Sequence, residues 1–500
     1  MDPFERPVFR EHPIGKKELL FGLGILLCCL GLCNFLFYGG LNLGFAIASS
    51  LCILCAAGYL LRSGRKLTFY PGAILALCLV IAASFARGDD IFVKFVMFCF
   101  LILGSSLGLC LLAGQQRRDP GKPGSLADGF ATIFRLGFGQ LAPTFRGLAR
   151  SLRHSGPLGR KSTAILAGLG LAVPILAIMI PLLIFSDAAF EGLMDQLPEF
   201  SFGELFMTVI FGGLLACLLF SQGVSLIHYD ETTPQQEKQP KGLATLTVNT
   251  VLSAVCAVYT VYLLSQLAYF SGGFSGILPE GYTLAQYARR GFFEIAWLCA
   301  INLSIIALSL ALNRQKEARS TKFLCLFIAL MTEFLVITAS AKMFLYIGSF
   351  GLTRLRVLTQ VILLFLALTT GLVAARLFVP KLSYMKTVVL AGLLLGALVS
   401  WVDVSSFVAR YNVDAYLSGK LETVDVSHLD SLGSGAVPHI YRLSQEAEDR
   451  KVAQMAANVI DHSYAHTADD FREWNYADQS AAQYLKQYEE TDRHEEADYR

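Results

Sequence analysis

Apolar runs of about 20 residues, separated by short polar segments, fill the chain up to Trp401. Such a run is long enough for an α-helix to cross a hydrocarbon core of roughly 30 Å. A transmembrane β-barrel would instead show short segments of alternating polarity. The pattern predicts an all-α protein, a polytopic bundle of eleven transmembrane spans followed by a small helical tail. The predicted spans are 18–38, 41–61, 68–86, 91–113, 163–185, 205–227, 243–268, 291–312, 323–345, 356–379 and 385–404.

Composition agrees with this class of protein. The chain is 54% hydrophobic and 16% charged, whereas a soluble domain is about a quarter charged. Almost all of the twelve cysteines lie inside the apolar runs, which favours small packing residues over a disulfide framework. The first run lacks a cleavage site of small residues, so we expect a retained helix rather than a signal peptide.

Basic residues orient the spans, because cytoplasmic loops carry an excess of Lys and Arg. Cations cluster before the first span and after the second, eighth and tenth spans, which places these segments on one side. The segment 187–199 holds four acidic residues and no Lys or Arg, and it falls on the opposite side. We therefore predict a cytoplasmic N-terminus and an extracytoplasmic C-terminus.

The same reading divides the chain into five parts. The predicted parts are a cytoplasmic N-terminus (1–17), a four-span unit (18–113), a basic cytoplasmic loop (114–162), a seven-span unit (163–404) and an acidic helical tail (405–500).

The basic loop contains an amphipathic stretch at 125–153. Apolar residues recur there at helical spacing, beginning after Ser125 and Asp128, which have the spacing of a capping box. Residues 115–161 carry nine Lys or Arg against two Asp. We expect Arg146, Arg150 and Arg153 to contact anionic lipid headgroups at the membrane surface. Docking of a cytoplasmic protein is the alternative.

The most specific string in the chain joins the ninth and tenth spans. Gly351 permits a tight turn and Thr353 can cap the following helix. Arg354 and Arg356 then lie in the first turn of that helix, where the helix dipole disfavours cations. We therefore expect them to have partners, which the acidic tail, Asp403 or Glu294 could supply.

These considerations predict an outer-face polar cluster built from three segments, 287–294, 342–356 and the tail. Such a cluster would bind an anionic ligand or clamp the tail to the membrane bundle. Its predicted members are Arg289, Arg290, Glu294, Lys342, Tyr346, Thr353, Arg354, Arg356, Asn412 and Asp425.

Glu333 lies near the middle of the ninth predicted span. On insertion scales, a charged residue at that depth costs about 2.5–3.5 kcal/mol. Such a residue therefore marks a candidate functional site. Two interpretations stay open. The carboxyl group either holds neighbouring helices together or takes part in proton or ligand transport.

The tail holds 18 acidic residues against 9 basic ones, counted from Ser405 to Arg500. Its His and Asp residues at 461–470 are typical of a solvated helix face, so we expect no metal site and no cofactor. Catalytic motifs such as HExxH, GxSxG and a P-loop do not occur in the sequence, and we do not expect an enzyme. Basic residues are spread over loops beside the membrane, which argues against nucleic-acid binding.

The segment around the junction of the ninth and tenth spans also resembles the signature of a family of bacterial multispanning membrane proteins catalogued only as a domain of unknown function. The matching residues are Met343, Leu345, Tyr346, Gly351, Leu352, Thr353, Leu355 and Arg356. Lys342 and Phe350 depart from the family's Arg and Tyr. Further similar stretches are Tyr287–Glu294, Arg410–Asn412, Asp425–Pro438 and Glu473–Tyr476. The resemblance implies a bacterial cytoplasmic membrane and no particular activity.

Two classes of function remain. We expect a membrane-embedded sensor, scaffold or assembly factor, with a tail that binds or senses and a basic loop that contacts lipid or a partner. The alternative is a secondary transporter that uses Glu333 in a site at the membrane midplane, built from helices broken by proline or glycine.

Overall fold

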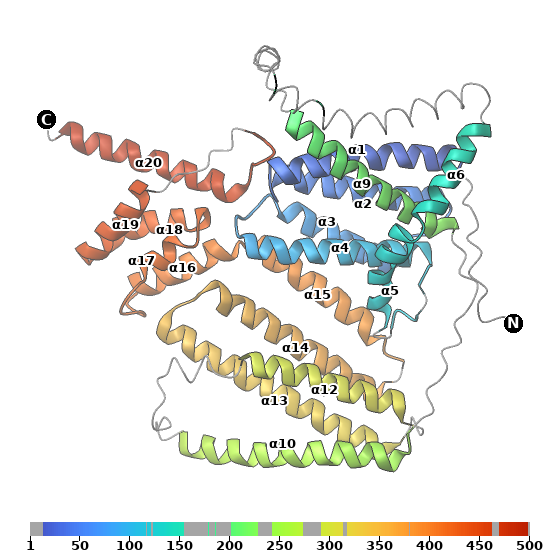
Figure 1. Ribbon diagram of the computed structural model, residues 1–500. Helices are drawn as coiled ribbons and strands as arrows, with labels where there is room; N and C mark the ends of the chain where they lie inside the picture. Colours follow the sequence, from blue (N-terminus) through green and yellow to red (C-terminus); the bar gives the residue numbers. More distant parts are fainter. Residues whose placement is uncertain are drawn as a thin grey trace. The chain divides into compact units, whose positions relative to one another are not determined.

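A computed structural model describes residues 14–116, 118–121, 124–154, 179, 186, 202–228, 243–273, 292–313, 318–379, 381–462 and 470–498. Within these ranges the fold is helical, as predicted, and nine helices are long and apolar enough to cross a membrane (Figure 1). The chain is therefore a multi-pass membrane protein. The shorter apolar helix α3 (Phe69–Ser84) corresponds to the third predicted span. Of the predicted span 163–185, residue 179 alone is among the described residues.

The chain forms two compact units, and each is described by itself. Unit 1 consists of residues 1–119, 123–233 and 466–482, and unit 2 of 120–122, 234–465 and 483–500. The span at 205–227 belongs to unit 1, where it packs with the first, second and fourth spans.

Unit 1 contains α1 (Lys16–Tyr38), α2 (Leu43–Arg62), α3, α4 (Ile91–Ala113) and α9 (Phe202–His228). Aromatic packing joins α1, α2 and α9, since the ring of Phe21 lies 4.3 Å from that of Tyr59 and 6.0 Å from that of Phe220. Gly223 on α9 makes room for this contact, because a Cβ there would lie 2.5 Å from the Phe21 ring.

The basic loop of unit 1 folds into α5 (Ser125–Thr132), the π-helical segment η1 (Ile133–Phe138) and α6 (Leu141–His154). One side of the loop packs against the bundle. The hydroxyl of Ser106 donates to the carbonyl of Gly129 at 2.9 Å, and that of Ser221 donates to the carbonyl of Leu136 at 3.0 Å. Leu136 is fully buried.

The membrane part of unit 2 contains α10 (Thr245–Gly273), α12 (Phe292–Leu312), α13 (Arg319–Phe350), α14 (Arg354–Phe378) and α15 (Tyr384–Trp401). Helix α13 contacts α10, α12 and α14, and α14 contacts α15 (Figure 1). Two hydrophobic clusters fill the spaces between α10, α12, α13 and α14. One is centred on Leu252, Ile306 and Ile328, and the other on Cys299, Val336 and Leu363.

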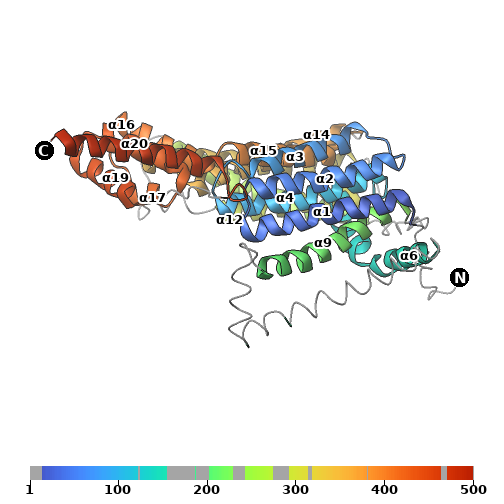
Figure 2. The same ribbon diagram turned by 90° about the horizontal axis from the view of Figure 1, so that it is seen from above.

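Five short helices follow α15 and form what is called here the C-terminal domain, residues 404–462. They are α16 (Val404–Leu417), α17 (Val426–Asp430), η2 (Ser434–Ala436), α18 (Val437–Glu446) and α19 (Arg450–His462). Their apolar faces meet in a small core that fully buries Val413, Leu429 and Leu443. Figure 2 shows α16, α17 and α19 close together. Helix α20 (Tyr476–Asp498) ends the described chain.

Candidate functional site

The joint between α13 and α14, residues 350–356, turns at Gly351. This glycine has φ +72° and ψ −173°, a backbone conformation that is open essentially to glycine alone. A Cβ at this position would also lie 2.6 Å from the side-chain oxygen of Asn412. Two independent constraints therefore require glycine here.

Asn412 of α16 holds the joint through the backbone of one residue, Leu352. The side-chain oxygen accepts from the backbone N–H of Leu352 at 2.7 Å, and the side-chain amide donates to the carbonyl of Leu352 at 2.8 Å. Both residues are buried. Such a buried pair of hydrogen bonds leaves a backbone donor and acceptor unsatisfied when the side chain is removed. The C-terminal domain is thus fastened to the end of the membrane bundle of unit 2.

Arg356 satisfies the end of the preceding helix. Its guanidinium donates to the carbonyl of Phe350 at 2.9 Å and to that of Gly351, and it lies 4.1 Å from the centre of the Tyr346 ring. A cation at the C-terminus of α13 is favoured by the helix dipole. From the sequence alone, we expect the dipole of α14, which begins at the joint, to disfavour Arg356. That expectation does not take into account the dipole of α13, which ends at the joint and favours a cation there.

Arg354 has a similar role toward the C-terminal domain. Its guanidinium donates to the carbonyl of Ser431, the residue that follows α17. Thr353 caps α14, accepting from the N–H of Arg356 at 3.4 Å, and Asp425 caps α17, accepting from the N–H of His428 at 2.9 Å. Each polar side chain here completes a helix end.

His428 lies beside these groups. Burial lowers the pKa of its imidazole, and the nearby Arg354 and Arg356 lower it further, while Asp425 opposes the change. The ring is therefore largely neutral near pH 7.

A comparison with protein families gives a match over residues 72–443 to the family described as Domain of unknown function (DUF4153). That range includes the joint and Asn412. The chain belongs to the DUF4153 family. No curated protein and no solved structure matches it.

The structure of this DUF4153 protein assembles part of the predicted outer-face polar cluster. Thr353, Arg354 and Arg356 belong to the joint, Tyr346 and Asn412 contact it, and Asp425 caps the neighbouring α17.

Other predicted members lie elsewhere. Lys342 is half-buried more than two turns before the end of α13, and Glu294 is exposed in the first turn of α12. Arg289 and Arg290 lie outside the described residues.

A second polar site crosses the interior of unit 2. The hydroxyl of Tyr259 on α10 donates to the side-chain oxygen of Asn302 on α12, and the amide of Asn302 donates to the hydroxyl of Thr332 on α13, both at 2.8 Å. All three residues are buried. Along α12 and α13, Asn302 and Thr332 lie between members of the two hydrophobic clusters, and Tyr259 of the first cluster extends this polar layer to α10.

Glu333 adjoins this layer and is half-buried. Its carboxyl group faces α14, where an oxygen lies 3.6 Å from the position of a Cβ on Gly371. The preceding residue, Thr370, is fully buried, and its hydroxyl has no hydrogen-bond partner within the described residues. Sequence reasoning identified Glu333 but missed Tyr259 and Asn302, whose polarity within apolar runs was the available signal.

The third polar site belongs to unit 1 and involves the docking segment, residues 470–478. The backbone N–H of Leu43 donates to the carbonyl of Trp474 at 3.1 Å, and the N–H of Tyr476 donates to the carbonyl of Ala86 at 2.9 Å. The docking segment thus completes the start of α2 and the turn after α3, where helix ends leave backbone groups unpaired.

Side chains support the docking segment. The guanidinium of Arg472 donates to the side chain of Asn34 at 3.1 Å, and the buried Asn475 donates to Asn42 at 3.4 Å. Lys94 donates to the same oxygen of Asn42 at 2.6 Å. The family resemblance included Glu473–Tyr476. It did not include Asn34 and Asn42, the side chains that accept hydrogen bonds from the docking segment.

Two remaining predictions concern lipid and metal. Arg146 and Arg150 are exposed on α6, and the Arg153 side chain lies outside the described set. Among the described residues, no group of three or more His, Cys, Asp or Glu could hold a metal ion.

Proposed function

We propose that this DUF4153 protein is a membrane-embedded scaffold or sensor that presents its C-terminal domain to a partner in a fixed orientation. The observation that supports the proposal is the pair of hydrogen bonds between the buried Asn412 and Leu352. A loop that only connected two spans would not need to bind a following domain. With this contact, a change in the packing of α13 and α14 is transmitted directly to α16.

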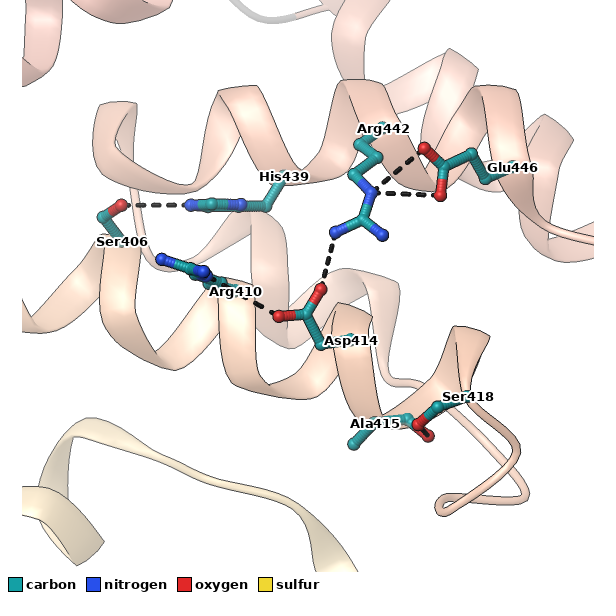
Figure 3. A network of polar contacts seen from close by, with 8 residues as sticks. All are labelled: Ser406, Arg410, Asp414, Ala415, Ser418, His439, Arg442 and Glu446. Atoms are coloured by element: carbon teal, nitrogen blue, oxygen red, sulfur yellow. Dashed lines mark hydrogen bonds and ion pairs between the residues drawn. The ribbon is translucent and has the colours of Figure 1, made fainter.

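The C-terminal domain offers a charged surface for such a partner. Arg410 and Arg442 both pair with Asp414, at 3.6 and 2.5 Å, and Arg442 also pairs with Glu446 at 3.0 Å (Figure 3). The Arg410 side chain is 72% exposed. Exposed ion pairs contribute only about 0–1 kcal/mol to stability. The network is therefore better suited to recognition than to holding the fold.

Photo-crosslinking in intact cells tests the proposal. We would place a photoreactive residue at Phe407 or at Met455, both exposed in the C-terminal domain. The expected result is a discrete protein adduct that is lost when Asn412→Ala is added. A matched control carries the residue at Leu398, which is exposed on α15. Absence of an adduct from both positions, or an adduct unaffected by Asn412→Ala, would contradict the scaffold.

The side of the membrane is tested separately. A single cysteine at the exposed Lys420, in a cysteine-free background, would be treated with a membrane-impermeant maleimide. Labelling in intact cells supports the predicted extracytoplasmic domain, whereas labelling only after lysis contradicts it.

Transport remains the second candidate, and the polar layer beside Glu333 is the observation that favours it. The Glu333 carboxyl group is half-buried and faces α14 at Gly371, and an ionisable group inside the membrane marks a candidate site for a transported ion or proton. The discriminating variant is Glu333→Cys. Its modification by the impermeant maleimide would indicate a water path to the membrane interior and favour transport. Protection would leave Glu333 as a helix contact.

A further inference from the structure

Unit 1 contains an elongated cavity of about 280 Å³ between α1, α2, α4, α9 and η1. Its lining extends along α2 from Phe45 to Leu60. With a rise of 1.5 Å per residue, this span is about 22 Å long. The cavity is therefore longer than half of the roughly 30 Å hydrocarbon core, and it runs along the transmembrane helices.

The walls are apolar apart from a few side chains. Gln222 on α9 is the most distinctive, because it is only 7% exposed and lines the cavity. Its amide donates to the hydroxyl of Ser106 at 3.3 Å, the one hydrogen bond that the structure describes for this side chain. A buried side-chain amide in an otherwise apolar wall favours a ligand that carries a polar group as well as an apolar chain.

The basic loop forms one wall of the cavity. Three residues of η1, Ile133, Gly137 and Phe138, belong to its lining. Phe130, Phe134 and Phe138 form a row of rings at spacings of 5.1 and 5.9 Å, and each is more than half exposed. An exposed aromatic row is typical of a segment in the membrane interface.

Cations follow directly after this wall. Helix α6 carries the exposed Arg146 and Arg150, and its Phe145 contacts Phe220 of α9 at 6.2 Å between rings. Helix α6 thus packs against α9 and η1, two of the elements that form the cavity wall, and its positive charge attracts anionic headgroups.

We propose that the cavity binds one acyl chain of an anionic phospholipid, whose phosphate is held by the basic α6. The apolar walls match the chain, the length matches its extension along the bilayer normal, and the arginines match the charge of the headgroup. Gln222 faces the ester region of the bound lipid. This site is independent of the proposed function, because it lies in unit 1 and uses no residue of the joint.

Native mass spectrometry of the full-length protein tests the proposal. Phosphatidylglycerol and phosphatidylcholine with identical chains would be added to delipidated protein. We expect one phosphatidylglycerol to be retained, with an affinity about tenfold or more above that for phosphatidylcholine. Equal retention of the two lipids would overturn the charge-based part of the proposal, and retention of neither would overturn it entirely.

Two variants locate the bound lipid. Ala56 lines the cavity and Ala57 does not, so Ala56→Phe fills the cavity while Ala57→Phe is its matched control. We expect Ala56→Phe to weaken phosphatidylglycerol binding by about tenfold or more, with Ala57→Phe unchanged. Arg146→Ala with Arg150→Ala should remove the preference for phosphatidylglycerol and leave the fold intact.

Unchanged binding in Ala56→Phe would place the lipid elsewhere on the surface and overturn the proposal. If Ala56→Phe fails to fold, cysteine crosslinking still decides the question. A cysteine at 56 that crosslinks to one placed within 163–185, in a cysteine-free background, would assign the cavity to the chain itself and refute the lipid site. A photoreactive phosphatidylglycerol that labels α2 or α9 would support it.

Discussion

The C-terminal region is attached in a different way in each unit. In unit 2, one side chain, Asn412, binds the backbone N–H and C=O of one residue, Leu352, at a turn that requires Gly351. In unit 1, the docking segment pairs its backbone with the ends of α2 and α3, and several side chains add to this. The first attachment depends on two residue identities, whereas the second is distributed over many groups. Single substitutions should therefore affect the joint far more than the docking segment.

The largest effect is expected from Gly351→Ala. The added Cβ meets Asn412 at 2.6 Å and the backbone conformation excludes alanine. We expect a loss of at least about 3 kcal/mol in the free energy of unfolding, measured by pulse proteolysis of the purified protein. Gly348→Ala is the matched control, because a Cβ there meets nothing within 4 Å. Equal stability of the two variants would show that the turn does not constrain the fold.

The next largest effect is expected from Asn412→Ala. Removing the side chain leaves the N–H and C=O of Leu352 unpaired, which costs about 2 to 3 kcal/mol. The same proteolysis assay should show early cleavage within residues 404–462. Asn458→Ala on the surface of α19 serves as the control, and a similar small change in both variants would contradict the comparison.

Arg356→Ala should weaken the joint by about 1 to 2 kcal/mol, because it removes the cap of α13 and the contact with Tyr346. Unchanged protease resistance of the C-terminal domain and unchanged protein level would refute its role as a clamp.

A smaller effect is expected in unit 1. Asn475 accepts from the N–H of Asp478 at 2.9 Å, which is the geometry of a helix cap, so Asn475→Ala should cost about 1 kcal/mol. The backbone contacts of the docking segment remain, and cleavage near residue 470 should rise only slightly. Glu473→Ala, at an exposed neighbour, is the control. A loss as large as that of Asn412→Ala would remove the proposed difference between the two attachments.

The smallest effect is a dependence on pH. The pKa of His428 is lowered by burial and by Arg354 and Arg356, so the unfolded chain binds a proton more readily than the folded one. The folded protein is most stable above the unfolded-state pKa of about 6.5, where the ring is neutral in both states. This stability is lost as pH falls toward and through the folded-state pKa. Burial, Arg410 and Arg442 likewise lower the pKa of His439. Melting curves should therefore show less destabilisation in acid for His428→Gln than for wild type.

Sequence reasoning succeeded where the signal was local. Span lengths follow from apolar runs, and the turn at Gly351 and the cap at Thr353 follow from residue type. The partners of the joint could not be read in this way, because Asn412 binds Leu352 across 60 residues of chain. Asn42 and Asn475 are 433 residues apart. Long-range pairing depends on how helices pack, and no local pattern records it.

The prediction of acidic partners for Arg356 illustrates the same limit. Charge counting suggested carboxylates, while the structure uses carbonyls at the end of α13 and an aromatic ring. A helix end supplies partial negative charge without any acidic residue. Such partners become visible only when the two helices of the joint are considered together.

Hydrogen exchange at Leu352 tests the central claim most directly. The protein, in lipid nanodiscs, would be digested after exchange and the peptide spanning 345–356 followed by mass spectrometry. We predict that the Leu352 amide is protected in the wild type, and that Asn412→Ala removes this protection together with that of 404–446. Equal protection at Leu352 in both proteins would contradict the claim that Asn412 fastens the C-terminal domain to the bundle.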